Sequence, residues 1–223
     1  LLGGVDITSA CANHMNPTLS YIDTVFVGRA EVLTGAIPVS KGGDSIGGTI
    51  LVNPAEPVFA GRKPAAATTK SQRGKLPVLA QADPALIFTG SVSAFYRSTD
   101  RGTKIAGNAT VATKNFSLNY SGAWARGDDY HAGNGAKVRS TNYNSQNHAA
   151  TLAYQNDGQL ITLRGTYQNI PYQGFANQRM DMLRNDSEQW ALQYQGGFGW
   201  GGLEASAFHE HTRHGMQFGP AKL

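Results

Sequence analysis

The residues of this chain with the most distinctive chemistry are its sulfur donors and the histidines beside them. Cys11 is the single cysteine, and Met15 is one of four methionines. Their four-residue spacing would let the two sulfurs meet on one helical turn or across a tight loop. A thiolate and a thioether are soft donors that favour Cu(I) over hard ions such as Mg²⁺ or Ca²⁺. His14 lies between them; we expect it to support a ligand or meet solvent, with direct ligation left open.

The remaining soft donors lie far along the chain. Met216 follows His214 in a His-x-Met pair, and Met180 and Met182 fall in an expected loop. No methionine lies inside an expected strand, where a methionine that only fills the core would be found. Two alternatives stay open: Cys11 as a small buried hydrophobe, and an exposed Met180/Met182 loop with no metal role rather than an outer relay for copper.

Other candidate sites are weaker. His209 and His211 share one face of an extended strand and His214 takes the other, so a common zinc centre is not expected and surface histidines are. The loop acids match no calcium-loop pattern, and we expect solvated charges there: Asp128, Asp129, Asp181 and Asp186. No motif supports nucleophilic catalysis, so we expect no enzymatic activity.

The composition indicates many short strands rather than helices. Charged residues make up 15% of the 223 residues and hydrophobic residues 40%, while 27 residues are glycine. Low charge without high hydropathy suits strands whose two faces meet different surroundings. No run of about 18 apolar residues could form a transmembrane helix. The net charge of +4 is dispersed and gives no sign of a nucleic-acid partner.

Alternation with a period of two begins at residue 85 and continues almost to the end. Near the C-terminus, for example, Trp190, Leu192 and Tyr194 alternate with glutamines. Such alternation is typical of strands with one apolar face. The seven expected strands are 86–98, 103–113, 116–126, 143–155, 159–169, 187–196 and 202–213.

The links between these strands favour a membrane barrel over a soluble sandwich. After a short first link at 100–102, short turns alternate with two long polar links, 126–142 and 170–186. Short turns on one side and long loops on the other are typical of outer-membrane barrels. A soluble β-sandwich with one wet face remains the alternative, because alternation does not name the apolar medium.

Seven strands cannot close such a barrel, because bacterial barrels have an even number of eight or more. We therefore expect residues 85–223 to be the N-terminal strands of a transmembrane antiparallel β-barrel and the chain to be a fragment. Residues 1–53 are glycine-rich and contain an expected strand at 49–52, and residues 54–84 are expected to form a proline-rich linker or crossing. The absence of an initiator methionine at Leu1 fits a truncated N-terminus.

Residues 30–35 (Ala-Glu-Val-Leu-Thr-Gly) and 45–52 (Ser-Ile-Gly-Gly-Thr-Ile-Leu-Val), followed by alternating strands, resemble the end of the plug of TonB-dependent outer-membrane receptors. Within that superfamily, the Cys-x-x-x-Met and His-x-Met pairs look like those of the copper receptors of the OprC/NosA type. The resemblance covers nearly the whole chain. It implies that residues 1–84 are the C-terminal part of a small α/β plug domain with its linker, placed before the barrel strands.

The resemblance also implies a function and its ligands. The chain would belong to a TonB-dependent receptor that takes up copper, as Cu(I), across the outer membrane of a Gram-negative cell. Its metal ligands would be Cys11, Met15, His214 and Met216. The partners would be a copper ion or a copper carrier, outer-membrane lipid, and TonB at the inner membrane through the missing N-terminus. The alternatives are a siderophore or cobalamin receptor of the same fold and a non-transporting β-structured adhesin.

The parity of the last expected strand supports this ligand set. Leu203, Ala205 and Ala207 share one face, which we assign to lipid. His214 and Met216 have the opposite parity, so both are expected to point into the lumen at the outer end of the strand. Phe208 also has lumenal parity and is expected to pack against the plug.

Overall fold

The computed structural model describes residues 17–35, 37, 47–61 and 85–219. Cys11, His14 and Met15 lie outside these residues. The described elements, in chain order, are the 3₁₀ turns η1 (Thr18–Tyr21) and η2 (Thr24–Phe26) and the strands β1 (Val27–Thr34), β2 (Gly48–Pro54), β3 (Ile87–Arg97), β4 (Gly102–Ala112), β5 (Phe116–Gly127), β6 (Tyr143–Asn156), β7 (Gln159–Gln173), β8 (Asp181–Phe198) and β9 (Gly201–Gln217). No helix among the described residues is long and apolar enough to cross a membrane.

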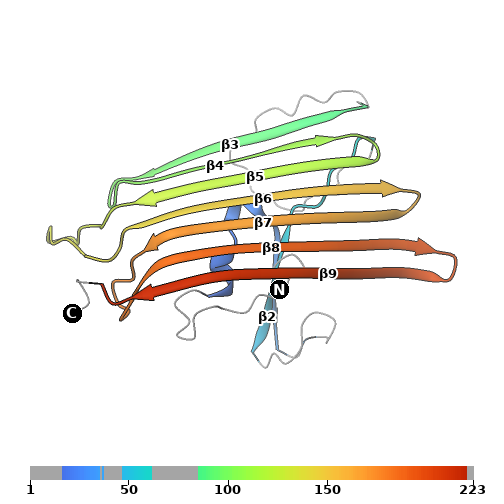
Figure 1. Ribbon diagram of the computed structural model, residues 1–223. Helices are drawn as coiled ribbons and strands as arrows, with labels where there is room; N and C mark the ends of the chain where they lie inside the picture. Colours follow the sequence, from blue (N-terminus) through green and yellow to red (C-terminus); the bar gives the residue numbers. More distant parts are fainter. Residues whose placement is uncertain (1–16, 36, 38–46, 62–84, 220–223) are drawn as a thin grey trace.

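The seven long strands form one antiparallel sheet in which each strand pairs with the next along the chain, from β3 to β9. Figure 1 shows them side by side in this order, with the blue N-terminal turns behind the sheet and the strand β2 reaching past β9 below it. Within the described residues, β3 and β9 are the two edges of the sheet and do not pair with each other. This open wall is a partial β-barrel, and it confirms the mostly-β fold and the seven strands expected from the alternation.

The sheet has two chemically opposite faces. The inner face, against which Tyr21 and Val52 pack, carries small and polar side chains that are buried: Ala106, Ser117, Ser121, Ala123, Asn147, Thr151, Thr162, Gln168, Asn185, Ser187, Gln189 and Ala191. The outer face carries large apolar side chains that are exposed: Phe88, Val92, Val111, Phe116, Leu118, Leu152, Tyr154, Ile161, Leu163, Tyr167, Trp190, Leu192 and Leu203. The burial pattern is therefore the reverse of that in a soluble sandwich.

The apolar side chains of the outer face form a band across the strands. Leu118, Leu152, Leu163 and Leu192 stand in one cross-strand row. Nearer the short turns, the rings of Phe116 and Tyr154 pack with centroids 4.8 Å apart.

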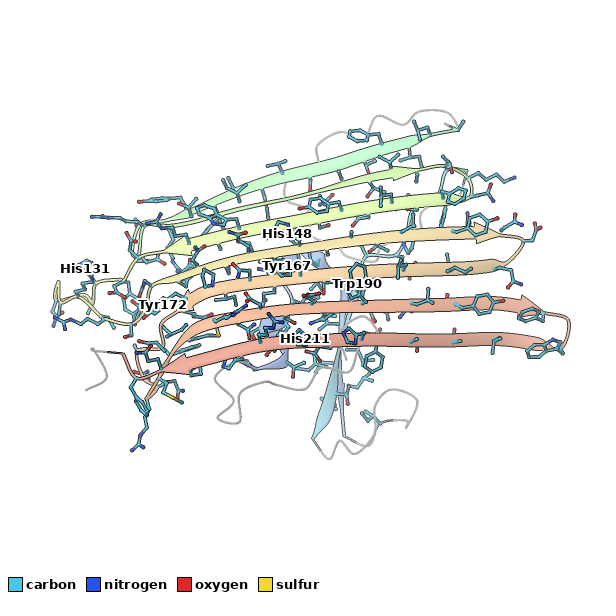
Figure 2. The ribbon with its side chains drawn as sticks, in the orientation of Figure 1. His131, His148, Tyr167, Tyr172, Trp190 and His211 are labelled. Atoms are coloured by element: carbon cyan, nitrogen blue, oxygen red, sulfur yellow. The ribbon has the colours of Figure 1, made fainter. Side chains whose placement is uncertain are left out.

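On the other side of the leucine row lies a second aromatic row. The His148 ring stacks between Tyr120 and Tyr167, with centroids 6.1 and 6.5 Å away. Trp190 continues this row on the next strand, as Figure 2 shows for the labelled side chains. Its indole lies over Gly165, where a Cβ atom would come within 2.7 Å of the ring. Glycine at this position therefore makes room for the Trp190 ring.

The N-terminal segment packs against the inner face of the sheet and forms an ion pair with it. Tyr21 and Val52 are buried in a small cluster with Ala191 of β8. Lys104 of β4 forms an ion pair with Asp23 at 2.8 Å. β1 and β2 pair antiparallel, as expected for the apolar run at 49–52.

The links at the two ends of the strands differ in length, as expected, but the second long link is shorter than predicted. β7 runs on to Gln173 and β8 begins at Asp181, so the expected link 170–186 shrinks to 174–180. Both long links lie at the same end of the sheet, where Figure 2 labels His131 and Tyr172. The extra strand residues continue the pairing with the neighbouring strands, apart from a bulge between Met182 and Arg184, and these backbone hydrogen bonds outweigh the polar composition that suggested a loop.

Three of the four loop acids are not solvated as expected. Asp186 lies in β8, where its carboxylate accepts a hydrogen bond from Nδ2 of Asn169 (2.6 Å) and pairs with Arg184. Asp181 is buried and accepts hydrogen bonds from the Ser140 hydroxyl (3.0 Å), the Tyr172 hydroxyl (3.2 Å) and the Phe175 N–H (3.0 Å). It thereby ties the link 128–142 to the link 174–180. A carboxylate can accept several hydrogen bonds at once, so it is well suited to this structural role.

Asp129 stabilises the first long link, residues 128–142, by contacts within it. It accepts from the backbone N–H groups of Thr141 (2.9 Å) and Asn142 (3.0 Å) and pairs with Lys137 at 3.3 Å. Burial alone would raise the pKa of Asp129, but these partners stabilise the ionised form and hold the pKa below its usual value.

Candidate metal centre

Two of the four predicted ligands can be located. Cys11 and Met15 lie outside the described residues, so their placement stays a prediction. His214 and Met216 stand near the end of β9, on the strand's inner side. Both lie beyond Trp190 and its cross-strand partner His209, and therefore beyond the apolar band.

The structure places another residue with a soft donor atom, Met182, beside His214 and Met216. Met182, expected in a loop, belongs to β8 and is the direct cross-strand partner of Met216. Its exposed fraction is 0%. The pairing of β8 with β9 shifts register between Met182 and Arg184, which marks a bulge. The bulge inserts one residue, so Met182 shares the inner face with Asn185 although three positions separate them.

The two ring nitrogens of His214 differ in their hydrogen bonding among the described residues. Its Nδ1 is 3.0 Å from Oδ1 of Asn185, the residue opposite it on β8. Its Nε2 is buried and has no hydrogen-bond partner among the described residues. Burial lowers the pKa of the imidazole, so the neutral ring, which can donate a lone pair, persists to lower pH than in water.

A buried nitrogen without a partner is costly, and a metal ion is one way to satisfy it. Cross-strand neighbours have Cβ atoms about 4.5–5.5 Å apart, which places Met182 beside Met216. Residues two apart on a strand share a face and stand about 7 Å apart, which places Met216 beside His214. The imidazole of His214 and the thioether of Met216 form a soft donor pair of the kind that suits Cu(I), and the buried Met182 is their neighbour.

Asn185 is held by a chain of side-chain amides that crosses four strands. Its Nδ2 donates to Oε1 of Gln168 on β7 at 2.9 Å. Nε2 of Gln168 donates to Oδ1 of Asn147 on β6 at 2.8 Å and to the backbone carbonyl of Ser20 at 2.7 Å. All three amide side chains are buried. The chain thus runs from His214 to the N-terminal segment on the inner face.

The competing zinc site is absent from the described part of the chain. His209 and His211 pair with Trp190 and Glu188 on the outer face, whereas His214 faces inward, as their parity predicted. No group of three or more His, Cys, Asp or Glu side chains among the described residues could hold a metal ion. Phe208 has the expected inward parity but is half exposed, so it is not packed as predicted against the described residues.

Sequence reasoning missed Asn185, and it named Met182 only as part of a loop, not as a strand residue opposite Met216. Asn185 has the parity of Ser187 and Gln189, and extending the alternation by one step would have placed it on the inner face. Met182 has the opposite parity, and only the bulge brings it to that face. No local sequence signal marks the bulge, because the extra residue is neither glycine nor proline.

The fold is shared with a known transporter. Among solved structures the chain is similar to one described as "Copper transporter OprC", with a TM-score of 0.80 and 19% sequence identity. The match covers 100% of this chain and 31% of that one, so the chain spans under a third of the length of that structure. No family model matches the chain, and no curated protein matches it by sequence. The chain therefore shares its fold with the matched part of that structure.

Proposed function

We propose that this chain is the plug end and first seven barrel strands of a TonB-dependent receptor that takes up copper across the outer membrane. The observation that carries the proposal is Nε2 of His214, which is buried on the inner face of a barrel wall beside Met216 and has no hydrogen-bond partner in the described part of the chain. The likeness to a copper transporter supports the fold on which these residues stand.

The membrane part of the proposal is supported by the outer face. A row of exposed leucines between two sets of aromatic rings would be unfavourable in water but matches a bilayer with its interfacial belts. On β8 the band extends from Trp190 to Phe198, close to the length of about 9–11 residues that a tilted strand needs to span a bilayer. The long links would then face the cell exterior and the short turns the periplasm.

The metal part of the proposal joins described and undescribed residues. Cys11 and Met15 of the plug would complete a four-ligand site with His214 and Met216. The thiolate is the only anionic member, so Cys11 is expected to contribute most to affinity for Cu(I). Uptake needs no covalent chemistry, because the protein binds the ion and a conformational change would release it.

The test is the copper content of the purified full-length protein, measured per protein after loading with Cu(I) under reducing conditions. Wild type should hold one equivalent, and Cys11→Ser and His214→Ala should lose it. The matched control is His211→Ala, which removes an outward histidine three residues away and should change nothing. A full equivalent in Cys11→Ser or in His214→Ala would contradict the copper site and favour a siderophore or cobalamin receptor of the same fold.

A further inference from the structure

The side-chain amides that connect His214 to the N-terminal segment can each be turned in two ways, and the backbone carbonyl of Ser20 determines which way they are turned. The carbonyl oxygen of Ser20 can accept a hydrogen bond but cannot donate one. Gln168 lies 2.7 Å from that oxygen and must therefore turn its NH₂ group toward it, since its own oxygen would be repelled. The same NH₂ group also reaches Oδ1 of Asn147. The orientation of the Gln168 amide follows from the backbone of the N-terminal segment.

The consequence passes along the chain to His214. With its NH₂ group turned to Ser20, Gln168 presents Oε1 to Asn185. Asn185 must therefore donate a hydrogen bond to this oxygen from its own NH₂ group. Asn185 then presents Oδ1 to the imidazole, and an oxygen that accepts requires a proton on Nδ1 of His214. A neutral imidazole carries one proton, so Nε2 keeps its lone pair.

We propose that Gln168 and Asn185 are positioning residues that fix His214 in the Nδ1–H tautomer, so that Nε2 is the nitrogen presented to a ligand. The tautomer is set by a backbone carbonyl in η1, 194 positions earlier in the chain. Neither amide contacts the ligand. The seating of residues 17–21 against β7 and the chemistry of His214 are thereby linked through three hydrogen bonds.

The tautomer can be read without any metal. In full-length protein carrying ¹⁵N-labelled histidine, ring signals of His214 are assigned by their loss in His214→Ala. Wild type should show the Nδ1–H pattern. Asn185→Leu removes the accepting oxygen at similar volume, and the Nε2–H form should then become populated. Asn185→Asp keeps an accepting oxygen opposite Nδ1 and should retain the Nδ1–H form.

The decisive pair of variants is Gln168→Leu and Asn147→Ala. Gln168→Leu touches neither His214 nor the ligand, yet it frees the Asn185 amide to flip and should admit the Nε2–H form. Asn147→Ala also removes a buried partner of Gln168 but leaves the Ser20 carbonyl in place, so the tautomer should stay as in wild type. If Gln168 only stabilised the fold, the two variants would affect the His214 tautomer alike, because both remove a buried hydrogen bond.

Copper binding gives a second readout, which rests on the proposed function. Outer partners of a metal-binding histidine typically contribute 10–100-fold to affinity, so Asn185→Leu should lower the affinity for Cu(I) by about that factor and Asn185→Asp should not. The inference is overturned if wild type shows the Nε2–H pattern, or if Asn185→Leu and Gln168→Leu leave the tautomer unchanged. Failure of wild type to bind copper would refute the proposed function alone, since the tautomer is measured without metal.

Discussion

The inner and outer faces of the sheet use the same strands for opposite purposes. Gln189 and Trp190 are adjacent on β8, yet the glutamine is 7% exposed and the tryptophan 51% exposed. The inner face buries polar groups and satisfies them with hydrogen bonds, and the outer face leaves leucines and aromatic rings uncovered. This difference agrees with the proposal that the outer face meets an apolar medium while the inner face meets protein.

The same contrast decides which histidines can do chemistry. Nδ1 of His148, on the outer face, is 2.7 Å from the Tyr120 hydroxyl within an aromatic row. His214, on the inner face, is oriented by buried amides and keeps a nitrogen free of hydrogen-bond partners among the described residues. Both residues stand on β-strands of one wall, so the face rather than the residue type determines the role.

The largest expected effect comes from charging the outer band. Leu163→Arg places a cation in the middle of the leucine row and should lower the free energy of unfolding in lipid vesicles by about 2–4 kcal/mol. The control, Glu188→Arg, changes an outer-face residue beyond Trp190 and should cost about 0–1 kcal/mol, as expected near an interface. Urea unfolding of the vesicle-inserted protein measures both. Equal and small effects would mean that the outer face meets water.

A smaller effect should separate the two methionines of the inner face. Met216→Leu removes a proposed ligand at similar volume and should weaken Cu(I) binding by at least about tenfold, the loss that even an outer partner of a metal site causes. Met182→Leu should leave the affinity unchanged, because Met182 is the buried cross-strand neighbour of Met216 and is not one of the four proposed ligands. Competition titration with a Cu(I) chelator compares them. A matching loss in Met182→Leu would make Met182 a ligand as well.

The smallest expected effect concerns the link 128–142, which connects β5 and β6 at one end of the sheet. The pKa of Asp129 is held below its usual value, so its contribution to stability is complete above about pH 3.9, the ordinary Asp value, and is lost as the pH falls through the lowered pKa. The protection of the Thr141 and Asn142 amides against hydrogen exchange, relative to their intrinsic exchange rates at each pH, should fall in that acidic range.

Asp129→Asn should make the same amides exchange faster at neutral pH, by an amount corresponding to about 1 kcal/mol. Asp157→Asn, in the short turn at the opposite end, is the exposed control and should leave them unchanged. Exchange at Thr141 that is indifferent to both acid and Asp129→Asn would show that the carboxylate does not hold this link.

The sequence by itself determined the strands and their faces. A period of two places alternate side chains on opposite faces whatever the partner strand, so the apolar outer face and the opposed parities of His211 and His214 were both predictable. Short turns bring neighbouring strands together, which makes the order β3 to β9 follow from the link lengths. Local chemistry sufficed for each of these features.

The tertiary structure decided the surroundings of the candidate ligand. The bulge near Met182 shifts the parity of β8 by one residue, and it depends on pairing with β9. The amide chain from His214 to Ser20 joins four strands and the N-terminal segment, so no local pattern could announce it. A hydrogen bond depends on where two groups meet in space, and residues distant in sequence meet only once the whole wall has assembled.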